Sequence, residues 1–334
     1  MTKPISRRTF VKGAGHAGIA AGAAAIVGAP AIVRSQQPIP IVTATLSGGW
    51  AELGNRLLMD GGFDVRNGLK FSNYNTYSAL ANYYTDITKG TIDVGIGAWD
   101  SFAKMWEKGV PVSLIGVIAT GSMVGMYTRA GGPTSMKDLK GKIVSAMQAS
   151  GTYTMTRTWV KMFDDLEFEK DIEVQNAPNP SAVVTIVAGG RADAGLSWEH
   201  SLSVGLHKVP GSQIGINVGD YYKKHTGHEM PFFGVVLRND WIKKQPPGTV
   251  AKVVKTYGNM IEWVHQHEDE FANRFSEIKL EPEIVKTAIS SGRMRMAMRS
   301  MAEKKDREDV LYCADLMLKG GAFEKKIDDG FFAA

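Results

Sequence analysis

Two stretches one hundred residues apart end in a tryptophan followed by an acid, and these side chains are the first candidates for chemistry. In α/β proteins, ligands bind just past the carboxyl ends of parallel strands. A Gly-Asp turn before each strand would explain the glycines of this repeat but not its tryptophans. The repeat therefore predicts two matching halves that face one shared crevice. Its members are Gly90, Asp93, Trp99 and Asp100, and then Gly190, Asp193, Trp198 and Glu199.

Four loops supply the candidate ligand-binding residues. A tryptophan at a strand end can stack on a planar ligand or help to cage a cation, although tryptophan is also common in cores. The other candidates are acids or small residues that begin a helix. The full set is Trp50, Trp99, Asp100, Ser150, Gly151, Thr152, Trp198 and Glu199.

The turn Ser150-Gly151-Thr152 precedes a predicted helix. Its backbone N–H groups can accept an anionic group, and an ordinary N-cap explains the same residues equally well. Asp100 and Glu199 can likewise cap the helices that they begin. If either acid points inward, it disfavours a bare anion such as nitrate. It would instead favour an amine, an N-heterocycle, or a zwitterion such as taurine with its amine near Glu199.

Other motifs point away from catalysis. His225 and His228, with Glu229, can supply two or three metal ligands, and the sequence leaves this open; no cofactor is expected.

The sequence contains no nucleophile elbow, Walker motif or GxGxxG. Methionines at helical spacing, Met294, Met298 and Met301, predict the apolar stripe of a helix.

The N-terminus carries an export signal. Arg7-Arg8 in the stretch 6–12 forms a twin-arginine motif, followed by a weakly apolar Gly/Ala-rich stretch and the small-residue site Ala29-Pro30-Ala31. That stretch is too weakly hydrophobic for a membrane anchor. We predict a signal peptide over residues 1–31 and a mature protein in the periplasm, exported by the twin-arginine pathway.

The charge and the cysteine content argue against a nucleic-acid-binding protein and against a disulfide-bonded one. The chain has 39 basic and 34 acidic residues, and the leader holds four of the basic ones: Lys3, Arg7, Arg8 and Lys12. Its removal leaves 35 basic against 34 acidic residues, a net charge of +1. No basic run remains for nucleic acid. The single Cys313 excludes an intrachain disulfide.

Strands and helices alternate along the chain, which predicts an α/β fold with mainly parallel sheets. Residues 39–46, 69–75, 93–98 and 112–118 are predicted strands of a first series, with a helix over 77–89. A second series follows residue 121, with strands over 124–128, 143–147, 172–176 and 194–197. A strand over 232–238 returns to the first series, and mainly helices follow from 249. The prediction is a first lobe of residues 36–123 plus 234–334 and an inserted second lobe of residues 124–233.

In this arrangement the chain resembles the periplasmic solute-binding proteins of ABC importers, in the nitrate/sulfonate/taurine group that also includes thiamine-pyrimidine-precursor binders. The matching motifs cover about residues 38 to 275. They are the Gly-Gly-Trp loop at 47–50, Gly90-x-x-Asp93, the segment 135–142, Gly190-x-x-Asp193 with Trp198-Glu199, and the segment 235–241. The resemblance implies a two-lobed type II binding-protein fold with two crossover strands and a helical C-terminal region. It also implies a ligand held between the lobes and delivery to an inner-membrane ABC permease.

The expected function is capture of a small organic solute, sulfonate- or taurine-like or nitrogen-containing, by a monomer without catalytic activity. A binder of a pyrimidine or an aromatic carboxylate is an alternative. A twin-arginine-exported enzyme on the same fold is another, although no nucleophile–His–acid set is evident. The pyrimidine-synthesising enzyme that shares this fold depends on a cysteine-rich motif, which this chain lacks.

Overall fold

The computed structural model describes residues 37–47 and 49–334. The predicted twin-arginine leader lies outside the described residues, and so does Gly48 of the Gly-Gly-Trp loop. None of the helices in the described part of the chain is long and apolar enough to cross a membrane.

A six-stranded sheet contains the first strands of the chain and two later ones. Its order is β11-β4-β10-β3-β1-β2. Strands β1, β2 and β3 run parallel, whereas β10 runs antiparallel to β3 and β4. The strands are β1 (Ile39–Leu46), β2 (Leu69–Tyr77), β3 (Val94–Ala98), β4 (Val112–Thr120), β10 (Pro231–Arg238) and β11 (Met296–Ser300).

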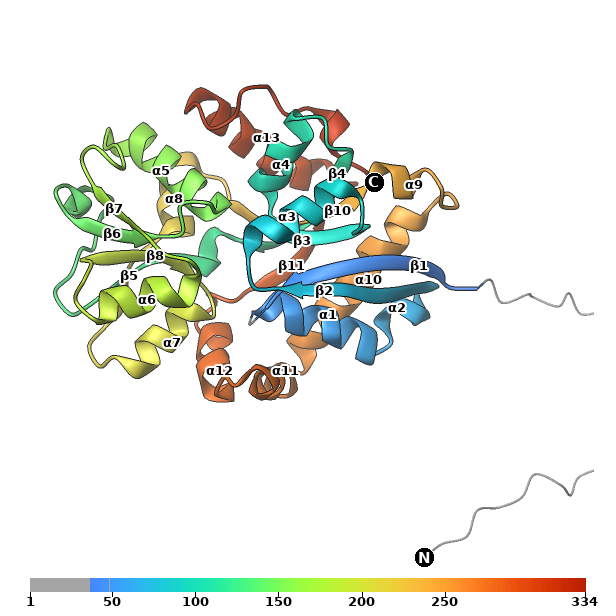
Figure 1. Ribbon diagram of the computed structural model, residues 1–334, viewed down its shortest axis with the longest axis horizontal. Coiled ribbons are helices and arrows are strands. Elements are labelled where there is room, and N and C mark those ends of the chain that lie inside the picture. Colours follow the sequence, from blue (N-terminus) through green and yellow to red (C-terminus); the bar gives the residue numbers. More distant parts are fainter. Residues whose placement is uncertain (1–36, 48) are drawn as a thin grey trace, which may run out of the picture. The chain divides into compact units, whose positions relative to one another are not determined.

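A five-stranded sheet contains the segment between β4 and β10, in the order β7-β6-β8-β5-β9. Here β6, β7 and β8 run parallel, and β5 runs antiparallel to β8 and β9. Figure 1 shows this sheet in green and yellow-green, apart from the six-stranded sheet. Its strands are β5 (Val124–Thr128), β6 (Ile143–Ala146), β7 (Glu173–Asn176), β8 (Ala194–Trp198) and β9 (Gln213–Asn217).

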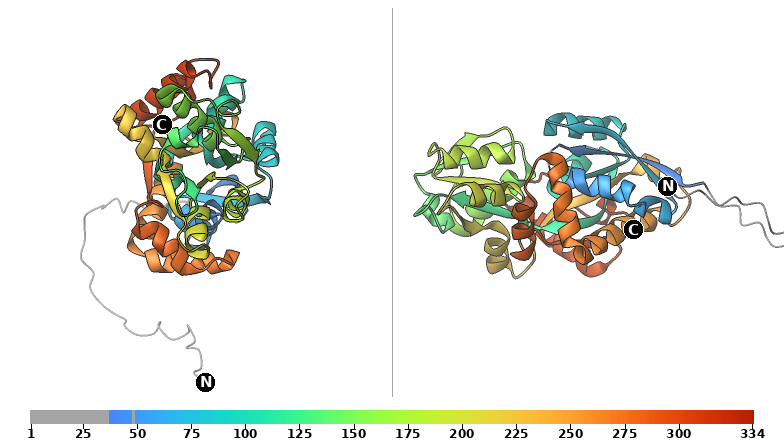
Figure 2. Two further views of the ribbon diagram at one scale, coloured as in Figure 1. Left: turned by 90° about the vertical axis from the view of Figure 1, so that its left-hand side faces the viewer. Right: turned by 90° about the horizontal axis from the view of Figure 1, so that it is seen from below.

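Helices flank both sheets, as Figure 2 shows. Six of them follow parallel strands directly: α1 (Trp50–Asp60), α3 (Leu80–Lys89), α4 (Trp99–Glu107), α5 (Gly151–Asp164), α6 (Pro180–Ala188) and α7 (Ser201–Lys208). The others are α2 (Phe63–Arg66), α8 (Val218–Thr226), α9 (Asn239–Ile242), α10 (Thr249–Gln266), α11 (Glu268–Arg274), α12 (Pro282–Ser290) and α13 (Lys304–Lys319).

The predicted fold class is confirmed, with one refinement. Each sheet is mixed rather than mainly parallel, because the returning strand β10 and the crossing strand β5 oppose their neighbours. The chain passes from β4 to β5 through a short 3-10 turn, Gly121–Met123. The division into lobes at residues 123/124 and 233/234 remains a prediction.

The prediction of a helix for the methionine stripe Met294, Met298 and Met301 is wrong in part. Met296 lies in strand β11 and pairs with Ala119 of β4. Met294 lies in the turn before this strand; Met294 and Met296 are buried, and Arg295 between them is exposed. The helix predicted from residue 77 begins only at Leu80, because β2 continues to Tyr77.

Candidate functional site

A pocket of about 430 Å³ lies where the parallel strands of both sheets end. Six strand-to-helix turns surround it, three from each sheet: β1–α1, β2–α3 and β3–α4, and β6–α5, β7–α6 and β8–α7. Phe233 of β10 completes the wall. Parallel strands bring their carboxyl ends to one edge of a sheet, so residues far apart in the sequence meet here.

Six of the eight residues proposed from the sequence line this pocket. They are Trp50, Ser150, Gly151, Thr152, Trp198 and Glu199. The first comes from the β1–α1 turn, and the other five from two turns of the five-stranded sheet. Trp99 and Asp100 are not among the lining residues.

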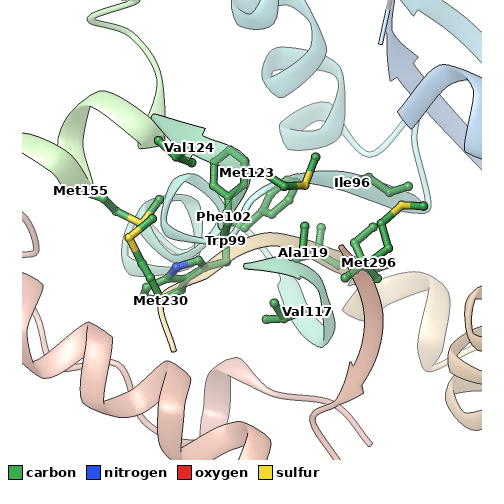
Figure 3. Packing of buried hydrophobic residues seen from close by; sticks show 14 of the residues in the cluster. Ile96, Trp99, Phe102, Val117, Ala119, Met123, Val124, Met155, Met230 and Met296 are labelled. Atoms are coloured by element: carbon green, nitrogen blue, oxygen red, sulfur yellow. The ribbon is translucent and has the colours of Figure 1, made fainter. Parts of the chain in front are cut away.

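Trp99 belongs to the core, contrary to the prediction of a ligand wall. Its side chain is 0% exposed, and its indole Nε1 donates a hydrogen bond to the Pro231 carbonyl at 3.1 Å. The ring packs edge-on against Phe323, with centroids 5.8 Å apart. Figure 3 shows it beside Met230 within the buried cluster. Because its polar atom already has a partner, Trp99 stabilises the fold rather than contacting the pocket.

Asp100 also departs from the predicted role, since it lies behind the pocket wall rather than in it. It is 1% exposed, and neither carboxylate oxygen has a hydrogen-bond partner among the described residues. A Cβ placed on Gly151 would lie 2.0 Å from Asp100 Oδ1 and 2.7 Å from the Ala98 Cβ. The first turns of α4 and α5 therefore meet at Gly151, where only a glycine leaves enough space. Burial raises the pKa of the Asp100 carboxyl to about 6.

Ser150 is the N-cap of α5, which is the ordinary role that the sequence left open. Its Oγ accepts a hydrogen bond from the Tyr153 amide at 3.1 Å and donates one to the Met147 carbonyl at 2.7 Å. Asn179 caps α6 in the same way, accepting from Ala182 N at 2.8 Å. Both cap residues still line the pocket.

Glu199 is neutralised by an arginine, which the sequence did not suggest. The Arg293 Nε lies 2.6 Å from Glu199 Oε1, and Ser203 N donates to Oε2 at 3.2 Å. Arg293 Nη2 also donates to Ser203 Oγ at 3.1 Å. The acid is therefore already paired, so the expected repulsion of an anionic ligand does not follow.

The sequence missed the remaining aromatic residues of the wall. Tyr77, Tyr84 and Phe233 line the pocket together with Trp50 and Trp198. Phe233 lies against Trp50, with ring centroids 5.5 Å apart. Tyr77 ends β2 and Phe233 lies near the start of β10, and the ends of these strands that face the crevice were the available signal; Tyr84 lies in α3 and gave no such signal.

His200 also lines the pocket, and the sequence analysis did not predict it as a site residue. It is 8% exposed, and its fully buried Nδ1 has no hydrogen-bond partner among the described residues. Burial lowers the pKa of His200 to about 4, so the imidazole is neutral near pH 7. No hydrogen bond joins it to Ser181 or Ser201, which pair with each other at 3.2 Å. The described residues thus present no serine–histidine pair here.

The electrostatics of the pocket come from helix N-termini. Among the described residues, no lysine or arginine lines it. The helices that begin at its wall are α1, α3, α4, α5, α6 and α7. Among the described residues, three of them (α1, α3 and α4) have no side-chain acceptor on their first amides, whereas α5 and α6 are capped and Glu199 accepts from Ser203 N in α7. Unsatisfied N–H groups and helix dipoles give such a site a positive potential that suits an anion.

The histidine pair is not gathered into a metal site. His225 stacks on Phe163 and lies 2.9 Å from the Tyr221 carbonyl, whereas His228 Nδ1 lies 2.9 Å from Asp309. Glu229 pairs with Lys223. Within residues 37–47 and 49–334, no three metal-ligating side chains come together.

A second hollow, of about 420 Å³, lies at the amino ends of β6 and β8, away from the crevice. Arg129, Lys142, Asp138 and Asp193 are among its lining residues. Both acids accept hydrogen bonds from backbone amides, and both basic side chains are exposed.

Comparisons with known proteins agree with this architecture. The family described as "NMT1/THI5 like" matches residues 61–270. No curated protein matches the chain at a significant level. Similar solved structures include the periplasmic aliphatic sulphonate binding protein SsuA from Escherichia coli, at 14% identity and a TM-score of 0.69, covering 87% of this chain and 96% of that one.

Two further structures show the same likeness. The alkanesulfonate-binding protein SsuA from Xanthomonas axonopodis pv. citri, bound to MOPS, is 14% identical with a TM-score of 0.69, covering 87% of this chain and 96% of that one. The periplasmic sulfonate-binding protein SsuA from Methylobacillus flagellatus KT is 17% identical with a TM-score of 0.67, covering 89% of this chain and 92% of that one. At these identities the likeness establishes the fold.

Proposed function

Since the chain belongs to the NMT1/THI5-like family, we propose that it is a solute-binding protein that captures a small organic anion between two lobes. The observation that carries this proposal is the pocket itself, where three strand-to-helix turns from each sheet surround about 430 Å³. Pockets of this size accept metabolite- to drug-sized ligands. Delivery of the ligand to an inner-membrane ABC permease completes the proposed role.

The preference for an anion follows from the charges at the wall. Six helices begin at the pocket, and their N-termini attract negative charge; no lysine or arginine lines it among the residues that the structure describes. Glu199 would oppose an anion, but Arg293 neutralises it at 2.6 Å. His200 is neutral near pH 7 and can take part in a hydrogen bond without adding charge.

The apolar part of the wall indicates a ligand with an organic body. Trp50, Tyr77, Tyr84, Trp198 and Phe233 provide aromatic surface. At about 430 Å³ the pocket is in the range typical of sites for small organic ligands and is larger than nitrate needs. An anionic head on an apolar or aromatic body fits best, as in an organosulfonate or an aromatic carboxylate. Proteins with similar structures are named for sulfonates.

We further propose that capture involves closure of the predicted lobes, residues 36–123 with 234–334 against 124–233. The turn Gly121–Met123 and the start of β10 are the two crossovers, and rotation there would separate α4 from α5 at Gly151. Twin-arginine export to the periplasm, proposed from Arg7-Arg8, places such a protein beside its permease.

A thermal-shift series tests the binding role directly. Benzenesulfonate, benzoate, taurine, inorganic nitrate and benzylamine are added to the purified mature protein. A ligand that binds only the folded state raises its stability by about 2.7 kcal/mol at a hundredfold excess over Kd. We expect shifts with the two aromatic anions and none with nitrate or benzylamine. Shifts confined to benzylamine would contradict an anion site.

Chemical analysis separates binding from catalysis. After incubation with a bound probe, the protein is denatured and the released compound is analysed by mass spectrometry. A binding protein returns the probe unchanged in stoichiometric amount, whereas product in excess over protein would establish an enzyme.

A further inference from the structure

Among the described residues, Glu199 is the one carboxylic acid that lines the pocket, and the positive charge of Arg293 neutralises it. The Glu199 side chain is 0% exposed, and a buried carboxylate requires a partner to remain charged. Arg293 supplies that partner through Nε at 2.6 Å. Arg293 itself is not a lining residue of the pocket.

The position of Arg293 is held by several contacts. It lies in the connection between α12 and β11, and its guanidinium also donates to Ser203 Oγ of α7 at 3.1 Å. Ser122 Oγ, in the turn that crosses to the five-stranded sheet, donates to the Arg293 carbonyl at 3.3 Å. The arginine is therefore fixed at the junction of the two sheets, with its charge directed at Glu199.

We propose that Arg293 determines the charge class of the ligand. With Arg293 present, the wall at Glu199 is neutral, and the helix N-termini make the pocket a site for an organic anion. Without it, an ionised Glu199 would repel an anion and attract an organic cation. Arg293 thus acts as a positioning and specificity residue that does not touch the ligand, and this inference rests on the proposed function.

The competing explanation is a purely structural role, in which loss of Arg293 loosens the junction and weakens every ligand alike. The charge of the probe and the pH of the measurement distinguish this structural role from the proposed electrostatic one. A carboxylate that has lost its cationic partner repels an anion only in its ionised form, and the ionised fraction of a carboxylate rises with pH. Among the described residues that line the pocket, His200 is the other group that can titrate near neutral pH, and it is neutral above about pH 4. A charge effect on binding would therefore grow with rising pH.

The experiment measures calorimetric affinities for benzenesulfonate and benzylamine with four variants of the mature protein. These are Arg293→Met, Glu199→Gln, the double variant, and Arg295→Met as a control that removes an exposed positive charge two residues away. In Arg293→Met we expect the affinity for benzenesulfonate to decrease by about tenfold or more as the pH is raised from about 5 to about 9. The affinity for benzylamine should increase at about pH 9.

The double variant should restore benzenesulfonate affinity to within about threefold of the wild type and remove the added pH dependence, because no charge is left unpaired. Arg295→Met should behave as the wild type. Equal losses for both probes, without a pH profile and without rescue by Glu199→Gln, would overturn this inference alone. A wild-type protein that prefers benzylamine or binds neither probe would overturn the proposed function together with it.

Discussion

Asp93 and Asp193 make the same pair of hydrogen bonds in two different sheets. Asp93 Oδ2 accepts from Val42 N at 2.8 Å, and its own amide donates to the Val42 carbonyl at 2.8 Å. Asp193 does the same with Ile143, at 2.9 and 2.8 Å. Each aspartate thus joins the amino end of one parallel strand to its neighbour. The aspartates of the repeat are structural, and only the far ends of their strands reach the pocket.

Two tryptophans of the repeat should behave differently on truncation. Trp198→Ala removes aromatic wall, so the affinity for a bound aromatic anion should fall by about ten- to hundredfold. Trp99→Ala instead opens a cavity in the core and should cost about 3–5 kcal/mol of unfolding free energy. Chemical denaturation and calorimetry on both variants measure the two effects. Unchanged affinity in Trp198→Ala would show that β8 does not present the ligand wall.

That difference was visible in the residue numbers. Positions 93 and 99 differ by six, whereas 193 and 198 differ by five. An offset of one residue turns a side chain to the other face of a strand. The residue equivalent to Trp198 is therefore Ala98, the last residue of β3, and both line the pocket.

Gly151 should not tolerate a side chain. In Gly151→Ala, the new Cβ would meet Asp100 Oδ1 at 2.0 Å, so the first turns of α4 and α5 must separate. We expect weaker ligand binding and a larger radius of gyration by small-angle scattering. Gly258→Ala in α10 is the matched control, since the new Cβ would lie 3.8 Å from Met298 Cβ, an ordinary van der Waals distance. Equal affinity in Gly151→Ala and the control would contradict the close approach.

Asp100 gives stability a pH dependence with a definite sign. Burial raises its folded-state pKa to about 6 from 3.8, so the native state binds more protons between these values and loses stability as pH rises through them. Asp100→Asn removes the penalty and should add up to about 3 kcal/mol near pH 7. Below about pH 4 the variant and the wild type should differ little.

His200 acts in the opposite sense. Its folded-state pKa of about 4 lies below the ordinary 6.5, so its contribution is present above about pH 6.5 and is lost as pH falls toward 4. The Asp100 effect is therefore measured as the difference between Asp100→Asn and the wild type at each pH, by urea denaturation. A difference that is the same at pH 4 and pH 7 would contradict the assignment to Asp100.

The leader makes a separate prediction in the cell. Changing Arg7 and Arg8 together to lysine should leave the precursor in the cytoplasm, because the twin-arginine pathway reads the arginine pair. Lys3→Gln, outside the pair, serves as the control. Fractionation and N-terminal sequencing should find the wild-type protein in the periplasm, beginning near Ile32. An exported protein that retains Met1 would contradict cleavage after residue 31.

Local sequence patterns predicted most strands closely but could not resolve contacts between distant segments. β1 was predicted with its observed bounds, Ile39–Leu46, because its apolar run is flanked by turn residues. The partner of Glu199 could not be predicted, since Arg293 lies 94 positions away in a segment taken for a helix. Similarly, nothing local shows that Asp100 and Gly151 meet. The position of the site could therefore be predicted from the ends of the strands. Its charge could not be predicted, because it depends on contacts between residues far apart in the sequence.

A crystal structure of the mature protein with benzenesulfonate tests the central claim most directly. We predict the sulfonate oxygens at backbone N–H groups where the pocket helices begin, and the ring against Trp50 and Trp198. The second hollow, where Arg129 and Lys142 are exposed, is the internal comparison, since simple attraction to basic side chains would favour it. An anion bound there, with none at the six strand-to-helix turns, would contradict the account.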